Sequence, residues 1–111
     1  MSINKLTSQY PEETEIYQKN GKLHKLDGPA LIYPNGTKQW YKNGKWHRED
    51  GPAIEYVNGA KQWYLNDKRH RIDGPAIIWA NGDKVWYING KEYLTDKQYS
   101  QGVKQYVQNL K

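Results

Sequence analysis

The chain has 111 residues and contains neither cysteine nor phenylalanine. Without cysteine it has no disulfide staples, no thiol nucleophile and no cysteine-based metal site. No apolar run approaches the ~18 residues that a membrane-spanning helix needs. The first residues also lack the apolar stretch of a signal peptide. We therefore expect a soluble, cytoplasmic protein that does not insert into membranes.

Hydrophobic residues make up only 36% of the chain, but 14% of all residues are aromatic, and every aromatic residue is tyrosine or tryptophan. That aromatic content is too high for a typical disordered segment. The chain is moderately basic, with 17 lysines and arginines against 12 acidic residues and a net charge of +5. Its length suits one domain, so we expect residues 1–111 to fold as a single unit.

The motif Asp-Gly-Pro-Ala occurs three times at a constant step of 23 residues, beginning at Asp27, Asp50 and Asp73. A histidine, a Trp-Tyr pair and two kinds of Asn-Gly turn keep the same step. The repetition covers residues 17–94 and gives three full units and a partial fourth. A unit this short cannot enclose a core by itself, so neighbouring units must stack and share one.

The turns within a unit predict β-hairpins. Asn-Gly between runs rich in Ile, Tyr and Trp favours a tight hairpin, because both central residues need positive φ. In the second unit we expect strands at residues 53–56, 61–65 and 68–71. The expected fold is therefore an all-β solenoid of stacked hairpins. The row of Trp40, Trp63 and Trp86 is the first candidate for its core, and the row of repeated alanines is the second.

The two ends of the chain depart from the repeat, as the ends of solenoids do. Residues 1–16 are expected to form an extended N-terminal segment. Residues 95–111 change to a helical period, and the pair Thr95 and Gln98 resembles a capping box. We expect a helix over residues 96–110 that caps the last hairpin. Gly102 lies inside this helix, where it costs ~1 kcal/mol relative to alanine.

The second unit carries a family resemblance. Residues 39–51, Gln-Trp-Tyr-Lys-Asn-Gly-Lys-Trp-His-Arg-Glu-Asp-Gly, resemble a MORN repeat in their unit length, aromatic pair, Asn-Gly-Lys turn and following histidine. Gly-Pro-Ala stands where the usual repeat has Gly-x-Gly, so the chain resembles a variant type found in bacterial, phage and large-virus proteins. The resemblance implies an elongated sheet of stacked hairpins that binds proteins or associates with lipids.

Catalysis is not expected from the repeated His-x-x-Asp spacing. A histidine and a carboxylate can form a general base and its orienting partner. Here, however, the spacing recurs in all three full units, at His24, His47 and His70. Folding needs one such arrangement per unit, whereas catalysis needs only one. Stacked units hold neighbouring imidazoles roughly 10 Å apart, too far for a shared zinc ion. We expect no enzyme activity, no cofactor and no metal.

Positions that vary between units are candidates for binding a partner. The second unit has the most divergent side chains, and Trp46 there is either an exposed hot spot or a residue packed on a neighbouring strand. We expect a non-catalytic module that grips a protein partner, such as a phage or mobile-element inhibitor of a host defence enzyme. The candidate partner-binding residues are Lys45, Trp46, Arg48, Glu55, Arg69 and Arg71.

Nucleic-acid or nucleotide binding is the alternative. Lysine rows beside exposed aromatic rows suit a phosphate backbone with stacked bases. The alternative phosphate-binding residues are Lys38, Lys61 and Lys84. Lysines on a sheet also blunt its edges and keep a solenoid from associating, so we expect a monomer or weak dimer.

Overall fold

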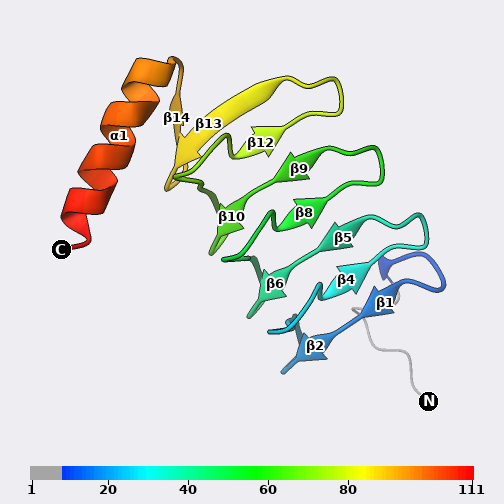
Figure 1. Ribbon diagram of the computed structural model, residues 1–111. Helices are drawn as coiled ribbons and strands as arrows, with labels where there is room; N and C mark the ends of the chain where they lie inside the picture. Colours follow the sequence, from blue (N-terminus) through cyan, green and yellow to red (C-terminus); the bar gives the residue numbers. More distant parts are fainter. Residues whose placement is uncertain (1–8) are drawn as a thin grey trace.

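The computed structural model describes residues 9–111, and it is an elongated, open antiparallel sheet with one helix at its C-terminal end (Figure 1). The described chain measures 54 × 35 × 20 Å along its principal axes. The all-β repeat fold with a capping helix is thereby confirmed, and the sheet does not close on itself. Of the expected N-terminal segment, residues 1–8 lie outside the described residues. No helix in the described part is long and apolar enough to cross a membrane.

Most strands are only two residues long, and they form two sets of hairpins. One set forms an eight-stranded sheet in the order β1-β4-β5-β8-β9-β12-β13-β14, and the other set forms the pairs β2-β3, β6-β7 and β10-β11. The strands are β1 (Glu15–Ile16), β2 (Gln18–Lys19), β3 (Lys22–Leu23), β4 (Leu31–Ile32), β5 (Lys38–Gln39), β6 (Tyr41–Lys42), β7 (Lys45–Trp46), β8 (Ile54–Glu55), β9 (Lys61–Gln62), β10 (Tyr64–Leu65), β11 (Lys68–Arg69), β12 (Ile77–Ile78), β13 (Lys84–Ile88) and β14 (Lys91–Tyr93).

Each full unit thus contributes one hairpin to the main sheet and one side hairpin. The second expected strand of a unit is divided, because the chain leaves the main sheet at the tryptophan. Trp40 separates β5 from β6, and its N–H donates to the carbonyl of Ala53 in the next unit at 2.7 Å. In the last unit the corresponding strand is not divided, because β13 continues through Trp86. A side hairpin is therefore tied to its own main hairpin and to the following unit.

Both kinds of Asn-Gly turn form as expected. At the tip of the side hairpin β6-β7, Asn43 and Gly44 have φ values of 52° and 81°, which is the type I′ pattern. In the main-sheet turns, the side chain of the asparagine closes the loop; the Oδ1 atom of Asn35 accepts the N–H of Thr37 at 2.9 Å. At the third side-hairpin tip Asp67 takes the place of glycine, with φ of 68°.

The core is built on the alanine row rather than the tryptophan row. Ala30, Ala53 and Ala76 have no exposed surface, and Leu31 and Ile54 beside them are at most 2% exposed. The three repeated tryptophans are only half-buried, so their assignment as the first core candidate was wrong. The physical reason is the two-residue alternation of a strand: Lys38 and Trp40 lie on the outer face, whereas Gln39 between them faces inward.

The repeat geometry begins upstream of residue 17. Residues 10–14 form a turn like that at residues 33–37, and Glu13 has a φ of 67° where Gly36 has 97°. β1 then pairs with β4 as β5 does. Tyr10 packs edge-on against Tyr33, with ring centroids 6.1 Å apart. Glu15 and Ile16 of the expected N-terminal segment are therefore part of the sheet, and residues 10–14 form the turn that precedes them.

Helix α1 (Asp96–Asn109) confirms the predicted C-terminal helix and lies against β13 and β14. Its N-cap is Thr95, whose Oγ1 atom accepts the N–H of Gln98 at 3.1 Å. A Cβ atom at Gly102 would lie 2.7 Å from the ring of Tyr93. Glycine therefore lets β14 approach the helix closely, and this contact offsets its low helix propensity.

Candidate functional site: arginine cradles and grooves

The Asp-Gly-Pro motif of the second unit holds an arginine from the same unit. The Nε atom of Arg48 donates to Asp50 at 2.9 Å, and its Nη1 atom donates to the carbonyl of Pro52 at 3.1 Å. The guanidinium lies 3.8 Å from the ring centroid of Trp40. A charged planar group thus bonds in its own plane and stacks on an aromatic face, as suits arginine and not lysine. We call this arrangement an arginine cradle.

The third unit builds the same cradle. Arg71 donates to Asp73 at 2.9 Å and to the carbonyl of Pro75 at 3.0 Å, and it lies 4.0 Å from the ring centroid of Trp63. In the first unit lysine replaces the arginine and tyrosine replaces the tryptophan. The Nζ atom of Lys25 lies 3.7 Å from the ring centroid of Tyr17. The repeated tryptophan is therefore the floor of a cation site on the outer face.

The glycine of the motif provides room for the guanidinium. A Cβ atom at Gly51 would lie 2.9 Å from the Cζ atom of Arg48, and one at Gly74 would lie 2.7 Å from that of Arg71. At Gly28, where lysine replaces arginine, the nearest atom is 3.7 Å away. Each residue of Asp-Gly-Pro thus has a role: the carboxylate and the proline carbonyl accept, and the glycine leaves the space.

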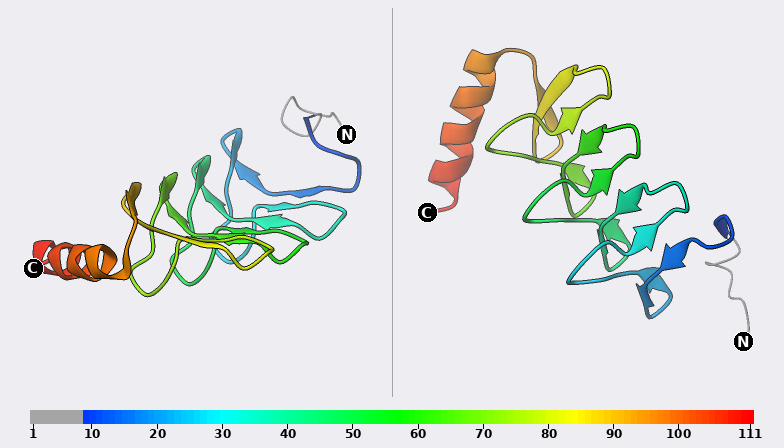
Figure 2. Two further views of the ribbon diagram at one scale, coloured as in Figure 1. Left: turned by 90° about the horizontal axis from the view of Figure 1, so that it is seen from above. Right: turned by 45° about the vertical axis from the view of Figure 1, so that its right-hand side comes forward.

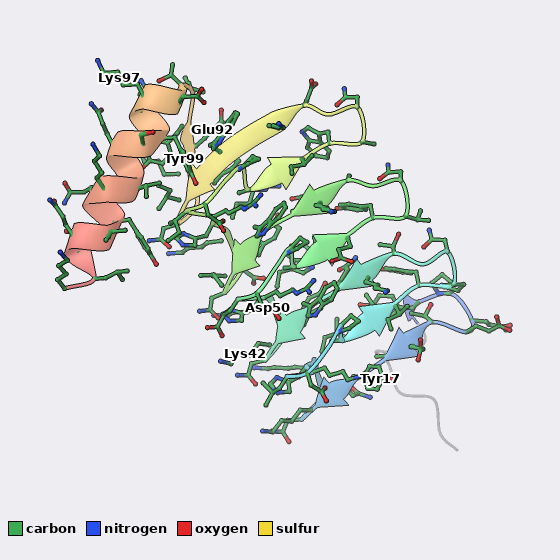
Figure 3. The ribbon with its side chains drawn as sticks, viewed as in Figure 1. Tyr17, Lys42, Asp50, Glu92, Lys97 and Tyr99 are labelled. Carbon is green, nitrogen blue, oxygen red and sulfur yellow. The ribbon has the colours of Figure 1, made fainter. Side chains whose placement is uncertain are left out.

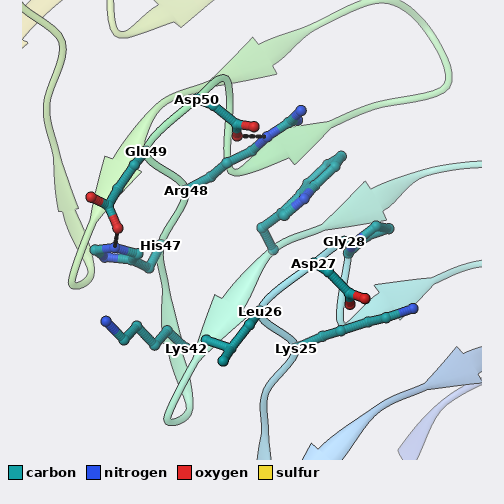
Figure 4. Close-up of a pocket in the computed structure, with 11 residues that line it drawn as sticks. Lys25, Leu26, Asp27, Gly28, Lys42, His47, Arg48, Glu49 and Asp50 are labelled. Atoms are coloured by element: carbon teal, nitrogen blue, oxygen red, sulfur yellow. Dashed lines mark hydrogen bonds and ion pairs between the residues drawn. The ribbon is translucent and has the colours of Figure 1, made fainter.

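Two grooves lie beside the cradles, one unit apart. The first has a volume of about 620 Å³ between residues 25–29 and 47–50, with Trp40 at its wall (Figure 4). The second has a volume of about 610 Å³ between residues 48–51 and 70–73, with Trp63 at its wall and Tyr106 of α1 beside it. Several of the lining residues change from unit to unit. Leu26, Glu49 and Ile72 occupy one such position, and Lys42 in the first groove corresponds to Leu65 in the second.

The grooves carry charges of both signs, and some carboxylates are held by arginines. The hydrogen bond from Arg48 holds the pKa of Asp50 below its ordinary value. In the second unit His47 also lies 3.3 Å from Glu49. Within residues 9–111 there is no group of three histidine, cysteine or acidic side chains close enough to hold a metal ion.

The repeated histidines connect successive units. The Nδ1 atoms of His24, His47 and His70 accept the backbone N–H groups of Asn43, Asn66 and Asn89, at 3.0 to 3.1 Å. The acceptor role requires an unprotonated Nδ1 atom. We expected a structural role, and the structure shows one, but the partner is the turn of the following unit and not the aspartate of the His-x-x-Asp spacing.

Trp46 packs within a column of rings on the side hairpins. Its ring centroid lies 5.8 Å from that of Tyr41 and 5.1 Å from that of Tyr64, and its Nε1 atom donates to Gln39 at 2.9 Å. Of the two roles considered for Trp46, the geometry supports packing. Arg69, one unit further, lies 5.5 Å from the ring of Tyr64.

Hydrogen bonds from the half-buried Gln39 and the buried Gln62 support this column, and the sequence analysis did not predict them. Gln39 accepts from Tyr41 at 2.9 Å, and Gln62 accepts from Tyr64 at 3.1 Å and from Arg69 at 3.2 Å. Burial raises the pKa of Tyr64, so its hydroxyl remains a donor. In the last unit valine replaces glutamine, and Tyr87 donates to Glu92 instead.

The predicted partner-binding residues are divided among three surfaces. Arg48 and Glu55 form an ion pair of 3.0 Å on the groove face, where Arg71 also lies. Trp46 and Arg69 belong to the ring column, and Lys45 is at a hairpin tip. The alternative phosphate-binding row is exposed on the outer sheet face, where Glu55 stands between two of its members in register. This row is Lys38, Lys61 and Lys84.

Comparisons of the chain with protein-family models, curated proteins and solved structures find no match.

Proposed function

We propose that this chain is a non-catalytic binding module that grips a protein partner along its row of grooves. The observation that carries the proposal is the duplicated groove: the same wall of tryptophan and cradled arginine recurs one unit on, with nearly equal volumes. A repeated tryptophan and arginine beside lining positions that change from unit to unit suit recognition by a fixed scaffold with variable contacts. The resemblance of residues 39–51 to a MORN repeat supports the same class.

The composition of the grooves favours a protein over a polyanion. Acidic and basic groups alternate along them, and apolar side chains face them. Leu26 is 80% exposed in the first groove and Ile72 is 38% exposed in the second. Exposed aliphatic side chains beside tryptophan and arginine provide the mixture typical of protein interfaces. Because the cradles fix the arginines, binding costs little side-chain entropy at those positions.

An inhibitor encoded by a phage or mobile element, acting on a host defence enzyme, is the specific form that we propose. A small rigid surface that binds without chemistry suits inhibition by occlusion. The orientation of the carboxylates supports a role without catalysis, because Asp50 and Asp73 are each bound to an arginine.

Site-specific photo-crosslinking tests the proposal. A crosslinking amino acid is placed at Leu26, at Ile72 or, as a control, at Val57, which is 63% exposed in a main-sheet turn outside the two grooves. One protein should be crosslinked in cells from both groove positions and not from Val57. Leu26→Asp and Ile72→Asp should then each weaken its binding about tenfold, or ~1.4 kcal/mol, while Val57→Asp leaves binding unchanged. Equal crosslinking from all three positions would contradict the proposal.

A further inference from the structure

The tips of the side hairpins form a second basic surface. In Figure 2 the hairpins β2-β3, β6-β7 and β10-β11 and the β13-β14 turn project to the same side of the molecule, one behind another. Each tip has the sequence x-Asn-Gly-Lys or x-Asn-Asp-Lys, and lysine also occupies the first position twice. All six lysines are exposed. We call them the lysine ridge: Lys19, Lys22, Lys42, Lys45, Lys68 and Lys91.

The contacts between tips keep the ridge in register. The Cβ atom of Lys22 lies 3.5 Å from the position that a Cβ atom would take at Gly44, on the next tip. Lys68 makes the same approach to Gly90, at 3.9 Å. The aliphatic stems of Lys22 and Lys68 therefore lie across the turn of the following tip. With two strands per unit, successive tips lie roughly 10 Å apart.

The charge of the ridge is not neutralised within the described residues. The ion pairs found in residues 9–111 involve His47, Arg48 and Arg71 as the basic partners, and no ridge lysine. Asp67 is the one acidic residue at the four tips, and its Oδ1 atom accepts the N–H of Trp46 at 2.7 Å. The outer-face lysine row differs, because Glu55 stands between Lys38 and Lys61.

We propose that the lysine ridge binds the phosphate backbone of double-stranded DNA. Four tips spaced by roughly 10 Å cover about 30 Å, close to one turn of the duplex at 34 Å. A single line of like charges along a rigid edge matches a line of phosphates. The tyrosines and tryptophans of the side hairpins are packed in the ring column or bonded to glutamine and glutamate, so the ridge offers charge without base reading. Binding there is independent of sequence. Lys42 also lines the first groove (Figure 4), whereas the other five ridge lysines line neither groove.

Two triple variants with equal net charge test the proposal. Lys22, Lys45 and Lys68 are changed to glutamine in the first variant, and Lys38, Lys61 and Lys84 in the control. Binding to a fluorescent duplex of about 24 base pairs is measured by anisotropy across a salt series, and circular dichroism confirms that both variants fold. The ridge variant should bind at least tenfold more weakly, with a salt slope reduced by about 2 to 3 units. The affinity of the control variant for the duplex should change by less than about threefold.

Asp67→Gly provides the opposite test, because Gly21, Gly44 and Gly90 already occupy the same position in the other tips. The change removes the single acid of the ridge, so binding should tighten severalfold. Three results would overturn the proposal: equal losses in the two triple variants, no binding by the parent protein at about 100 µM in low salt, or tighter ridge-dependent binding to poly-glutamate or to anionic lipid vesicles than to the duplex. The last two probes distinguish DNA from other polyanions.

Discussion

Two of the rows of basic residues along this molecule, the cradle row and the lysine ridge, differ in the contacts that their charged groups make. In the cradle row, Arg48 and Arg71 stack on tryptophan and bond to aspartate and a proline carbonyl. In the lysine ridge, the ammonium groups stand at hairpin tips without an ion-pair partner among the described residues. A count of lysine and arginine treats these rows alike. In the structure, the cradle arginines are bonded within the fold, whereas the ridge lysines form no ion pair within residues 9–111.

The C-terminal end shows what replaces a cradle where the repeats stop. Trp86 has no arginine above it, and the position that arginine would take is Leu94. Instead Tyr99 of α1 approaches Trp86, with ring centroids 6.3 Å apart (Figure 3). Its hydroxyl lies 2.7 Å from the carbonyl of Arg71 and accepts the N–H of Gly74 at 3.2 Å. The helix thus places a ring against Trp86, where the earlier units place a cation over the aromatic side chain.

The largest effect should come from the floor of a cradle. Trp63→Ala removes both a half-buried ring and the surface on which Arg71 stacks. We expect a loss of about 2–4 kcal/mol in the free energy of unfolding, somewhat below the value for a fully buried tryptophan. Urea denaturation measures it, and Lys61→Ala on the same face serves as the control with no comparable loss. An unchanged unfolding midpoint for Trp63→Ala would show that the cradles do not stabilise the fold.

The next largest effect should come from Gly102 in the capping helix. Replacing it by alanine should lower the stability of the protein, although alanine has the higher helix propensity. Gly102→Ala would gain ~1 kcal/mol in an exposed helix. Here the new Cβ atom would lie 2.7 Å from the ring of Tyr93, so that ring must move or α1 must shift. We expect a net loss of about 1–2 kcal/mol, measured by thermal unfolding with Ser100→Ala as the helix control. A stabilised Gly102→Ala variant would mean that α1 packs more loosely on β14.

A conservative exchange should separate the two basic rows. Arg71→Lys keeps the charge but cannot stack and also bond to both Asp73 and the carbonyl of Pro75, so we expect a loss of about 1–1.5 kcal/mol. The matched exchange on the ridge, Lys68→Arg, should change stability by less than about 0.5 kcal/mol. Chemical denaturation of both variants gives the comparison. Equal losses would remove the distinction between built-in and free charges.

The sequence predicts the fold well because its signals are local. The 23-residue step and the Asn-Gly pairs specify hairpins that must stack, and the helical period after Thr95 specifies the cap. The cradles were missed because they depend on which face of a bent strand carries Trp40, and that face is set by the exit of the chain from the main sheet. A usable signal was present: Tyr17 changes to tryptophan in the units where Lys25 changes to arginine.

Long-range hydrogen bonds account for the rest of what the sequence did not predict. His24, His47 and His70 were matched with the nearest aspartates, but their acceptor atoms bond to turns 19 residues later. The partner of a side chain across a unit boundary depends on how two units stack. The bonds of Gln39 and the buried Gln62 were missed for the same reason, since each side chain bonds to residues on the side hairpin.

The smallest effect should be a pH dependence of the stability, and it should come from His70. Burial lowers the pKa of His70 below its ordinary value of about 6.5. The unfolded chain therefore binds a proton more readily than the folded chain, and the contribution of His70 is fully present above pH ~6.5 and is lost as the pH falls below it. Protonation of the Nδ1 atom also removes the acceptor for the N–H of Asn89. The melting temperature should thus fall between pH 7.5 and pH 5, and His70→Gln, which offers an acceptor that does not titrate, should fall less. The same slope in both proteins would show that His70 does not couple folding to pH.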